Sequence, residues 1–419
     1  MQVEEHRLSL SRQACVERDG ADPLARTRGL FELPEGLVYL DGNSLGALPR
    51  SVRARLQGVV EAQWGRDLIG SWNAHGWIDL PAHVGAKIAR LVGAQADEVV
   101  AADSTSVNLF KLAAAAVRMR PERRVVVSEA GNFPTDLYVL QGLADLLGDR
   151  LELRVVAPEG LEAALDGDVA LLLLSHVHFK SGRVHDMAAL TRRAHEVGAL
   201  TLWDLSHSAG ALEVRLNADA ADFAVGCGYK YLNGGPGAPA FLFAARRHHG
   251  EMRNPLSGWM GHARPFDFDD EYEPASGVLR GLCGTPPILS LAALDEALDA
   301  FDGVSMADLR EKSKRLTGLF LELVEARCAG SGLEPACATD ADERGSQVSL
   351  RHPEGYAIVQ ALIARGAVGD FRAPDILRFG FAPLYVGYAD VWDAVDRLAA
   401  VMAEESWREP QFRERRAVT

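Results

Sequence analysis

The run Val169-Ala-Leu-Leu-Leu-Leu-Ser175 carries no polar residue before its last position. Such a run is typical of a strand that is covered on both faces; a buried helical turn is the alternative, and the polar residues around the run favour the strand. Short apolar runs of this kind recur from about residue 98 to residue 246, with amphipathic stretches between them. That alternation predicts βαβ units and a mostly parallel, doubly wound sheet with helices on both faces.

The expected elements divide the chain into a large α/β domain and a small α+β domain. Strands of the large sheet are expected at 124–128, 153–156, 169–175, 200–204, 223–227 and 240–244, and helices at 107–119, 137–147 and 186–197. After the break at Pro286-Pro287, helices are expected at 288–300, 306–326 and 388–404, and strands at 348–351 and 376–381. We therefore expect a large domain at residues 61–290, a small domain at 291–419, and an N-terminal segment, 1–60, that joins the small domain.

Composition and charge narrow the class of function. The 419 residues are 48% hydrophobic and 24% charged, which is the balance of an ordinary globular protein. The net charge of −14 disfavours binding to nucleic acid or to an anionic membrane. The five cysteines are widely spaced and predict neither a disulfide framework nor a structural zinc site. The N-terminus lacks the order of a signal peptide, and no apolar run approaches the roughly 18 residues of a membrane helix, so we expect a cytoplasmic protein.

Candidate functional residues are those that end the apolar runs, because ligands of an open α/β sheet bind at the carboxyl ends of its strands. One run ends in Asp204-Leu-Ser-His207, and the next ends in Tyr229-Lys230 ahead of the glycine-rich Asn233-Gly-Gly-Pro-Gly237. Another ends in Ser175-His176-Val-His178, and the run from Val99 leads into Ser104-Thr105-Ser106 and a helix. These segments are expected to meet at one edge of the sheet.

Three of these strand ends suit a single cofactor. Hydroxyls and N–H groups at a helix N-terminus, as at Thr105, suit a phosphate, although ordinary N-capping is the alternative. Lys230 lies among glycines and aromatic residues, where burial favours a Schiff-base amine over a solvated surface lysine. Asp204 suits a pyridinium nitrogen, with a helix cap as its alternative. A lysine, an aspartate and a phosphate site together are what pyridoxal phosphate requires.

A metal site is the competing interpretation of the histidines. His176 and His178 share one face of a strand, and His207 could join them. The chain has no H-E-x-x-H motif and no evident carboxylate to complete such a site, so no metal is predicted. The His248-His249 pair follows the last strand of the sheet in an Arg-rich stretch and is expected to face solvent.

Seven motifs carry a family resemblance that spans nearly the whole chain. They are LDGNSLG at 40–46, TSVNL at 105–109, NFPTD at 132–136, DLSH at 204–207, GYKYLNGGPG at 228–237, GWMGH at 258–262 and RFGFAPLY at 378–385. With these motifs the chain resembles the bacterial-type kynureninases, pyridoxal-phosphate-dependent hydrolases of the fold-type I aminotransferase superfamily. The lysine and aspartate motifs alone indicate only the superfamily, whereas GNSLG, NFPTD and GWMGH are more specific. The resemblance implies a seven-stranded large sheet.

The resemblance also implies roles for individual residues. Lys230 would bind the cofactor covalently, and Asp204 would keep its pyridine nitrogen protonated. Tyr229 would be an acid or base in the late steps, or else only an anchor of the phosphate. The residues implied to contact the cofactor are Thr105, Ser106, Phe133, Pro134, Thr135, Asp136, Ser175, Asp204, His207, Tyr229, Lys230, Trp259 and Thr285. Of these, Trp259 and Thr285 would come from the neighbouring subunit, which makes the active unit a homodimer with shared active sites.

Three further residues are expected to contact the substrate. Arg378 interrupts an apolar strand-like run, so its guanidinium needs an anion, either the substrate α-carboxylate or an internal acid. Trp72 is a candidate wall for the aromatic ring of the substrate, with core packing as the alternative. Ser44 lies in the GNSLG motif. Gly284-Thr285 replaces the Ser-Asn of animal-type members, and this difference favours kynurenine over 3-hydroxykynurenine.

The implied reaction is hydrolysis of L-kynurenine to anthranilate and L-alanine by cleavage of the Cβ–Cγ bond, in tryptophan catabolism and NAD biosynthesis. A side activity on 3-hydroxykynurenine stays open. The alternative on the same fold is a cysteine desulfurase or selenocysteine lyase, which needs a mobile cysteine nucleophile; Cys337 is the one loop-like candidate. A non-catalytic cofactor-binding protein is a further alternative, and the presence of both Lys230 and Asp204 speaks against it.

Overall fold

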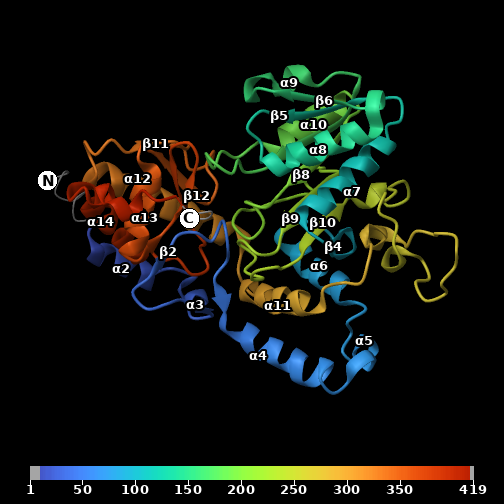
Figure 1. The fold of residues 1–419 in the computed structure, drawn as a ribbon, viewed down its shortest axis with the longest axis horizontal. Helices are drawn as coiled ribbons and strands as arrows, with labels where there is room; N and C mark the ends of the chain where they lie inside the picture. Colours follow the sequence, from blue (N-terminus) through green and yellow to red (C-terminus); the bar gives the residue numbers. More distant parts are fainter. Residues whose placement is uncertain (1–9, 416–419) are drawn as a thin grey trace.

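The computed structural model describes residues 10–415. Figure 1 shows a large layered α/β part and a smaller α+β part beside it. Elements from both ends of the chain meet in the smaller part, where α2 (Arg12–Gly20) packs on α14 (Tyr388–Ala403). No helix in the described part of the chain combines the length and the apolar character that a membrane span requires.

A seven-stranded sheet forms the centre of the large part. Its strands, in spatial order, are β4 (Val99–Ala101), β10 (Ala240–Ala244), β9 (Phe223–Cys227), β8 (Leu200–Asp204), β7 (Val169–Ser175), β5 (Val125–Glu129) and β6 (Glu152–Val156). Only β10 runs antiparallel to its neighbours β4 and β9. Residues 169–175 form β7, which pairs in parallel with β5 and β8, so the helical alternative for this run is wrong. The predicted fold class, a doubly wound and mostly parallel sheet, is confirmed.

Helices cover both faces of this sheet. Side chains alternate between the two faces along each strand, so one strand packs against helices on both sides. On one face, Leu171 and Leu173 pack with residues of α7 (Thr105–Arg118) and α8 (Pro134–Leu147). On the other face, Leu172 and Leu174 belong to a core that includes residues of α6 (Leu80–Leu91) and α10 (Met187–Glu196). The short helix α9 (Leu161–Ala164) precedes β7. Burial on both sides explains why the strands lack polar alternation.

The small part is built on a four-stranded antiparallel sheet. Its order is β11 (Glu334–Pro335), β12 (Gln347–Arg351), β15 (Ile376–Gly380) and β14 (Asp370–Arg372). The remaining elements after the large sheet are α11 (Ile288–Leu298), α12 (Met306–Arg327), α13 (Gly355–Ala364) and β13 (Ala367–Val368). The two long helices expected after the proline pair are present, and the first of them ends two residues earlier than expected.

The N-terminal segment contacts both parts of the molecule. Its elements are α2, α3 (Ala25–Arg28), β1 (Phe31–Glu32), β2 (Val38–Tyr39), β3 (Leu48–Pro49) and α4 (Arg50–Gly58). A π-helical turn (Val59–Trp64) and α5 (Ser71–Ala74) follow α4. Strand β2 pairs with β13, and the Asp19 carboxylate accepts from the N–H groups of Tyr388 and Ala389 at the start of α14. Helix α4 instead packs on α11. The domain boundaries at residues 60 and 290 remain a proposal.

The buried Asp222 carboxylate binds several side chains, and one of them was expected to face solvent. His248 is buried, and its Nε2 lies 2.7 Å from Asp222 Oδ1, so the prediction that His248 faces solvent is wrong. The same carboxylate binds His195 Nε2 at 2.8 Å and Arg247 Nη2 at 2.8 Å. Burial alone raises the pKa of Asp222, but the hydrogen bonds from His195 and His248 outweigh it and hold the pKa well below its usual range. Asp222 therefore fastens α10 and the segment after β10 to the start of β9.

Candidate active site

A cavity of about 280 Å³ lies at the carboxyl ends of the central strands. It is lined by Ser104, Thr105, Ser106, Phe133, Thr135, Asp136, Ser175, Val177, Phe179, Asp204, Ser206, His207, Cys227, Tyr229, Lys230, Ala238 and Ala240. Ten of the residues predicted to contact the cofactor are among them. The chain topology brings them together, because β5, β7, β8 and β9 are parallel and end at one edge of the sheet.

The start of α7 forms one side of this cavity. Ser104 is the N-cap, and its hydroxyl accepts from Val107 N at 3.3 Å. The capping interpretation therefore holds for Ser104. Thr105 and Ser106, in the first turn, line the cavity beside it. Free N–H groups at the beginning of this 14-residue helix favour an anion there.

Lys230 follows β9 and enters the cavity between aromatic rings. Its Nζ lies 3.1 Å from His207 Nε2, 5.8 Å from the centre of the Phe133 ring and 5.9 Å from that of the Tyr229 ring. The chain can turn here because residue 228 is a glycine: a Cβ at this position would lie 2.4 Å from Pro239 O. The predicted lysine is thus positioned by the tight approach of β9 to the segment before β10.

Two buried aspartates lie at the floor of the cavity. Asp204 Oδ1 accepts from Ser206 N at 2.8 Å and from Ser206 Oγ at 2.6 Å. Asp136 Oδ2 accepts from Ser175 Oγ at 3.1 Å, while its buried Oδ1 has no hydrogen-bond partner in the described structure. Burial raises the pKa of both carboxyls, and the charge of Asp204 raises that of Asp136 further. The charge of one buried carboxyl therefore disfavours ionisation of the other.

His207 is held in its neutral form beside Lys230. Burial, and then the positive charge of Lys230, lower the pKa of His207 well below its usual value. Its Nδ1 is buried and has no partner among the described residues. With Asp136 Oδ1, this leaves two buried polar atoms in a cavity that also has a lysine, an aspartate and a helix N-terminus. This donor set fits a flat, polar cofactor with a phosphate at one end and a basic nitrogen at the other.

Arg378 lies outside this cavity, on β15, and its side chain is 2% exposed. It donates from Nε to Asp370 Oδ1 at 2.8 Å and from Nη1 to Phe179 O at 2.8 Å, and Nη2 binds Asp370 Oδ2 as well. The internal acid that the sequence left open as an alternative is therefore present. Since Phe179 lines the cavity, Arg378 lies directly behind the cavity wall.

Asp370 and Asp41 were missed as site residues by the sequence analysis. Asp370 is the register partner of Arg378 across β14 and β15, and Arg372 Nη2 also binds its Oδ2, at 2.6 Å. The spacing of Asp370 and Arg372 puts both on one face of a strand, which is a signal in the sequence, but the pairing partner is known only once the register is known. Asp41 belongs to the LDGNSLG motif, from which only Ser44 was predicted to be a site residue.

Ser44 joins the N-terminal segment to these charges. Its Oγ donates to Asp370 Oδ2 at 2.8 Å and accepts from Arg378 Nη2 at 2.9 Å. Two residues further on, Gly46 N donates to Tyr229 O at 2.8 Å, next to the lysine. The GNSLG motif therefore spans the distance between Arg378 and the Lys230 loop.

Comparison with known proteins shows the family. The chain is 51% identical to the kynureninase of Pseudomonas fluorescens over 414 residues, which cover 98% of this chain and 100% of that one. Kynureninases of Burkholderia mallei and Burkholderia pseudomallei are 50% identical over the same lengths. The family profile for the kynureninase C-terminal domain matches residues 309–398. The chain belongs to the kynureninase family.

Solved structures with the same fold are more distant from this kynureninase-family chain. The cysteine desulfurase of Thermococcus onnurineus has a TM-score of 0.74 at 18% identity, covering 91% of this chain and 97% of that one. The cystine C-S lyase C-DES, solved as a mutant with glycine linked to its PLP cofactor, has a TM-score of 0.76 at 17% identity, with 89% and 98% covered. At this identity the likeness shows the fold alone.

Cys337 differs from a mobile nucleophile. It follows β11, is half-buried and packs against the hydrophobic core. Burial raises the pKa of its thiol, which disfavours the reactive thiolate. The desulfurase alternative thus lacks support at the one cysteine that the sequence offered for it.

Besides Arg378 and Ser44, four predicted site residues of this kynureninase-family chain lie outside the cavity of their own chain. Trp72, in α5, packs edge-on against Trp77 with 6.1 Å between ring centres, and α5 lies away from the strand ends in Figure 1. Trp259 is 37% exposed and Thr285 is exposed. Pro134 occupies the first position of α8, where its missing N–H costs no hydrogen bond. None of these four residues lines the cavity that Lys230 enters.

The histidines proposed as metal ligands have other partners. His176 Nδ1 binds Ser208 Oγ at 2.9 Å, and His178 Nε2 binds Gly131 O at 2.8 Å. Burial lowers the pKa of His176 to about 3. Within residues 10–415, no three His, Cys, Asp or Glu side chains are grouped so that they could hold a metal ion.

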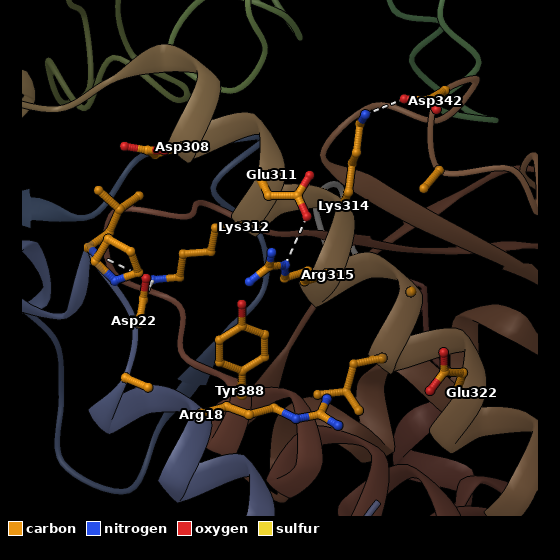
Figure 2. A pocket seen from close by; sticks show the side chains of 16 residues that line it. Arg18, Asp22, Asp308, Glu311, Lys312, Lys314, Arg315, Glu322, Asp342 and Tyr388 are labelled. Atoms are coloured by element: carbon orange, nitrogen blue, oxygen red, sulfur yellow. Dashed lines mark hydrogen bonds and ion pairs between the residues drawn. The ribbon is translucent and has the colours of Figure 1, made fainter. Parts of the chain in front are cut away.

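A wider pocket of about 810 Å³ lies between α2, α12 and α14 (Figure 2). Its cations have acids beside them: Lys312 binds Asp22 at 2.6 Å, Arg315 binds Glu311 at 2.9 Å, and Lys314 pairs with Asp342. Four cationic and five acidic side chains line the pocket, so its charges nearly balance and favour no strongly charged ligand.

Proposed function

We propose that the chain hydrolyses L-kynurenine to anthranilate and L-alanine with pyridoxal phosphate as cofactor. The observation that carries the proposal is the cavity in which Lys230, Asp204 and the N-terminus of α7 meet. Those three groups match the aldehyde, the pyridine nitrogen and the phosphate of the cofactor. The relatives named kynureninase, similar over the whole chain, support the choice of substrate and reaction.

When bound, pyridoxal phosphate withdraws electrons from the amino acid, which acidifies the proton at Cα and delocalises the charge left at Cβ after Cβ–Cγ cleavage. The Asp204 carboxylate holds a proton at the pyridine nitrogen. Thr105, Ser106 and the N–H groups of α7 bind the phosphate, and Phe133 packs against the ring. Because His207 is neutral, it can donate or accept a hydrogen bond without placing a second positive charge beside Lys230.

Two side chains of the Gly228-Tyr229-Lys230 segment move protons in this proposal. Lys230 would hold the cofactor through its amine, and the same Nζ would take the Cα proton of the substrate. Burial raises the pKa of the Tyr229 phenol, so this hydroxyl stays protonated at neutral pH and is a proton donor for the later steps. Anchoring of the phosphate is its other role, and the two roles use the same hydroxyl.

Arg378 is proposed to bind the substrate α-carboxylate. Asp370 already occupies Nε and Nη2, and Phe179 O takes one N–H of Nη1. The substrate carboxylate therefore approaches the Nη1 edge, where Arg378 meets the wall of the cavity. Ser44 and Arg372, which share Asp370 with Arg378, form the rest of this surface.

We also propose a homodimer with shared active sites. An apolar patch of Val60, Trp64, Leu68, Ile69 and Leu289 is exposed on the π-helical turn, the segment after it and the start of α11. A second copy of the chain is the partner that would cover this patch and would use Trp259 and Thr285. The loop that carries Trp259 also carries the exposed Phe266 and Phe268, and this loop projects at the right of Figure 1.

We further propose a cytoplasmic location. The five cysteines form no disulfide, and this supports a reducing compartment.

The decisive experiment mixes purified, cofactor-loaded protein with L-kynurenine and follows the fluorescence of anthranilate. We expect anthranilate and alanine in equal amounts, no product from Lys230→Ala, and full activity from Lys314→Ala, which removes a lysine outside the cavity. A yellow, loaded protein that forms no anthranilate would refute the assignment. If Cys337→Ala turns over kynurenine at the wild-type rate, the Cys337 thiol has no role as a nucleophile in this reaction.

A further inference from the structure

Four charged side chains meet behind the proposed substrate site, and we call them the four-charge cluster: Asp41, Asp370, Arg372 and Arg378. Asp370 binds both guanidinium groups, Arg378 at 2.8 Å and Arg372 at 2.6 Å. The fourth member, Asp41, lies beside Asn43: with the Asn43 amide turned so that its nitrogen faces Asp41, that nitrogen donates to Asp41 Oδ1 at 3.2 Å and the amide oxygen lies 3.2 Å from Arg378 Nε. The cluster joins the LDGNSLG segment to β14 and β15.

The four-charge cluster is neutral when all its members are ionised, because it holds two acids and two guanidinium groups. A substrate carboxylate at Arg378 adds a third negative charge. Asp370 and Arg378 are each only 2% exposed, whereas Asp41 is half-buried and the Arg372 side chain is 34% exposed, so water compensates only part of that extra charge. An unbalanced buried charge is costly, and a proton taken up by one of the acids removes the imbalance.

The two acids differ in how readily they accept this proton. For Asp370, burial raises the pKa, but the charge and hydrogen bonds of Arg378 outweigh burial and leave the pKa lowered. For Asp41, burial and then the charge of Asp370 raise the pKa to about 7, although Ser44, Arg378 and Arg372 lower it in part. Asp41 is therefore the acid that takes up a proton near neutral pH.

The remaining titratable groups that face Asp41 carry no charge at neutral pH. They are the phenols of Tyr39 on β2, Tyr231 after the catalytic lysine, and Tyr385 after β15, whose interactions with Asp41 contribute to their own titration. Burial raises the pKa of all three phenols, so they stay protonated. The charge balance at Asp41 thus depends on the four-charge cluster and the incoming carboxylate.

We propose that Asp41 is a positioning residue that takes up a proton from solvent when a substrate carboxylate binds Arg378, so that the four-charge cluster stays neutral. This inference rests on the proposed function, which supplies the carboxylate. Protonation leaves Asp370 ionised and still bound to both guanidinium groups, and Arg378 keeps its orientation while its remaining N–H group binds the substrate.

The proposal fixes the sign of a pH dependence. Below about pH 7, Asp41 already holds its proton and carboxylate binding does not depend on it. Above that pH each binding event must include a proton, so the apparent affinity falls up to about tenfold per pH unit. Asp41→Asn, which imitates the protonated carboxyl, removes this dependence and binds about tenfold more tightly than the wild type at pH 8.

The test is titration calorimetry of the holoenzyme with desamino-kynurenine, which keeps the aryl ketone and the carboxylate of kynurenine but lacks the amine. Measurements at pH 8 in two buffers of different ionisation enthalpy count the protons taken up. We expect an uptake close to one for the wild type, none for Asp41→Asn, and the wild-type value for Asp302→Asn, which removes an exposed acid on another surface. An uptake near zero in the wild type overturns the proposal without reference to any variant.

Turnover gives an independent readout. The ratio of kcat/KM of Asp41→Asn to that of the wild type is expected to rise by about tenfold per pH unit above pH 7, while groups common to both proteins cancel. A ratio that is flat with pH overturns the proposal. If kynurenine is cleaved but no proton is taken up, only the role of Asp41 fails; if kynurenine is not cleaved at all, the proposed function fails and the role of Asp41 falls with it.

Discussion

Arg378 is oriented before any substrate arrives, because both carboxylate oxygens of Asp370, on the neighbouring strand, accept hydrogen bonds from its guanidinium group. The planar guanidinium of Arg378 binds Asp370 along one edge and keeps an N–H group at Nη1 for the substrate, whereas a lysine has a single point charge. Arg378→Lys keeps a positive charge beside Asp370 but loses the N–H group at Nη1. We expect KM for kynurenine to rise about 30-fold, corresponding to about 2 kcal/mol, with the cofactor still bound.

Steady-state kinetics and the absorbance of the bound cofactor check this expectation. Arg351→Lys, an exposed arginine on the adjacent strand β12, is the matched control and should leave KM unchanged. A wild-type KM in Arg378→Lys would restrict this arginine to a structural role with Asp370.

Asp222 is a second buried acid whose partners fix its charge. Its lowered pKa means that it stabilises the folded state above its unfolded pKa of about 4, and this contribution is lost as the pH falls below that value. Asp222→Asn should lower the free energy of unfolding at pH 7 by about 3 kcal/mol. In urea unfolding, the gap to the wild type should shrink below pH 4. Asp166→Asn, an exposed acid paired with Arg154, should cost less than about 1 kcal/mol.

Among the elements, the GNSLG loop is fitted most closely to the catalytic lysine. A Cβ on Gly46 would lie 2.3 Å from Lys230 O and 2.7 Å from Asn233 Cα. Because both atoms belong to the backbone, Gly46→Ala must displace the Lys230 loop, at a cost of about 1–3 kcal/mol. We expect a lower Tm and weaker retention of pyridoxal phosphate.

Gly142→Ala, in α8, is the matched control for this prediction. A Cβ there meets no atom within 4 Å, and alanine is a better helix former than glycine, so this variant should be as stable as the wild type or slightly more so. Equal Tm values and equal cofactor retention for the two variants would contradict the close fit of Gly46.

The long elements could be predicted from the sequence, and the short ones could not. β7 to β10 have the expected bounds because their runs are apolar on both faces and end at polar residues. Strands of two residues, such as β2 and β13, are too short to show any periodicity. Cross-strand partners such as Asp370 depend on the register, which is set by packing, and so the acid that holds Arg378 was not foreseen. Lys230, Asp204 and Thr105 were foreseen because parallel strands end at one edge.

At the scale of the whole molecule, the proposed dimer predicts how a surface substitution changes the state of association. Ile69, a member of the apolar patch, is 80% exposed, and a charge there would have to be buried between two copies. Ile69→Glu should therefore be monomeric in sedimentation equilibrium at micromolar concentration, and inactive because Trp259 and Thr285 of a partner are missing from each site. Leu146→Glu, which alters an equally large exposed side chain on α8, should stay dimeric and active. A dimeric Ile69→Glu would exclude this patch as the interface.

The pairing of β2 with β13 has a consequence for synthesis. A ribosome releases the N-terminal segment first. Strands β1 and β3 can pair with each other at once, but β2 has no sheet partner until residues 367–368 have emerged, and α2 waits still longer for α14. Strand β4 likewise waits for β10, while β5 to β9 can assemble in the order in which they appear. The nascent chain therefore carries α2, β2 and β4 without their partners during much of translation, and a chaperone that shields them should raise the yield of the protein more than one that acts on the finished chain.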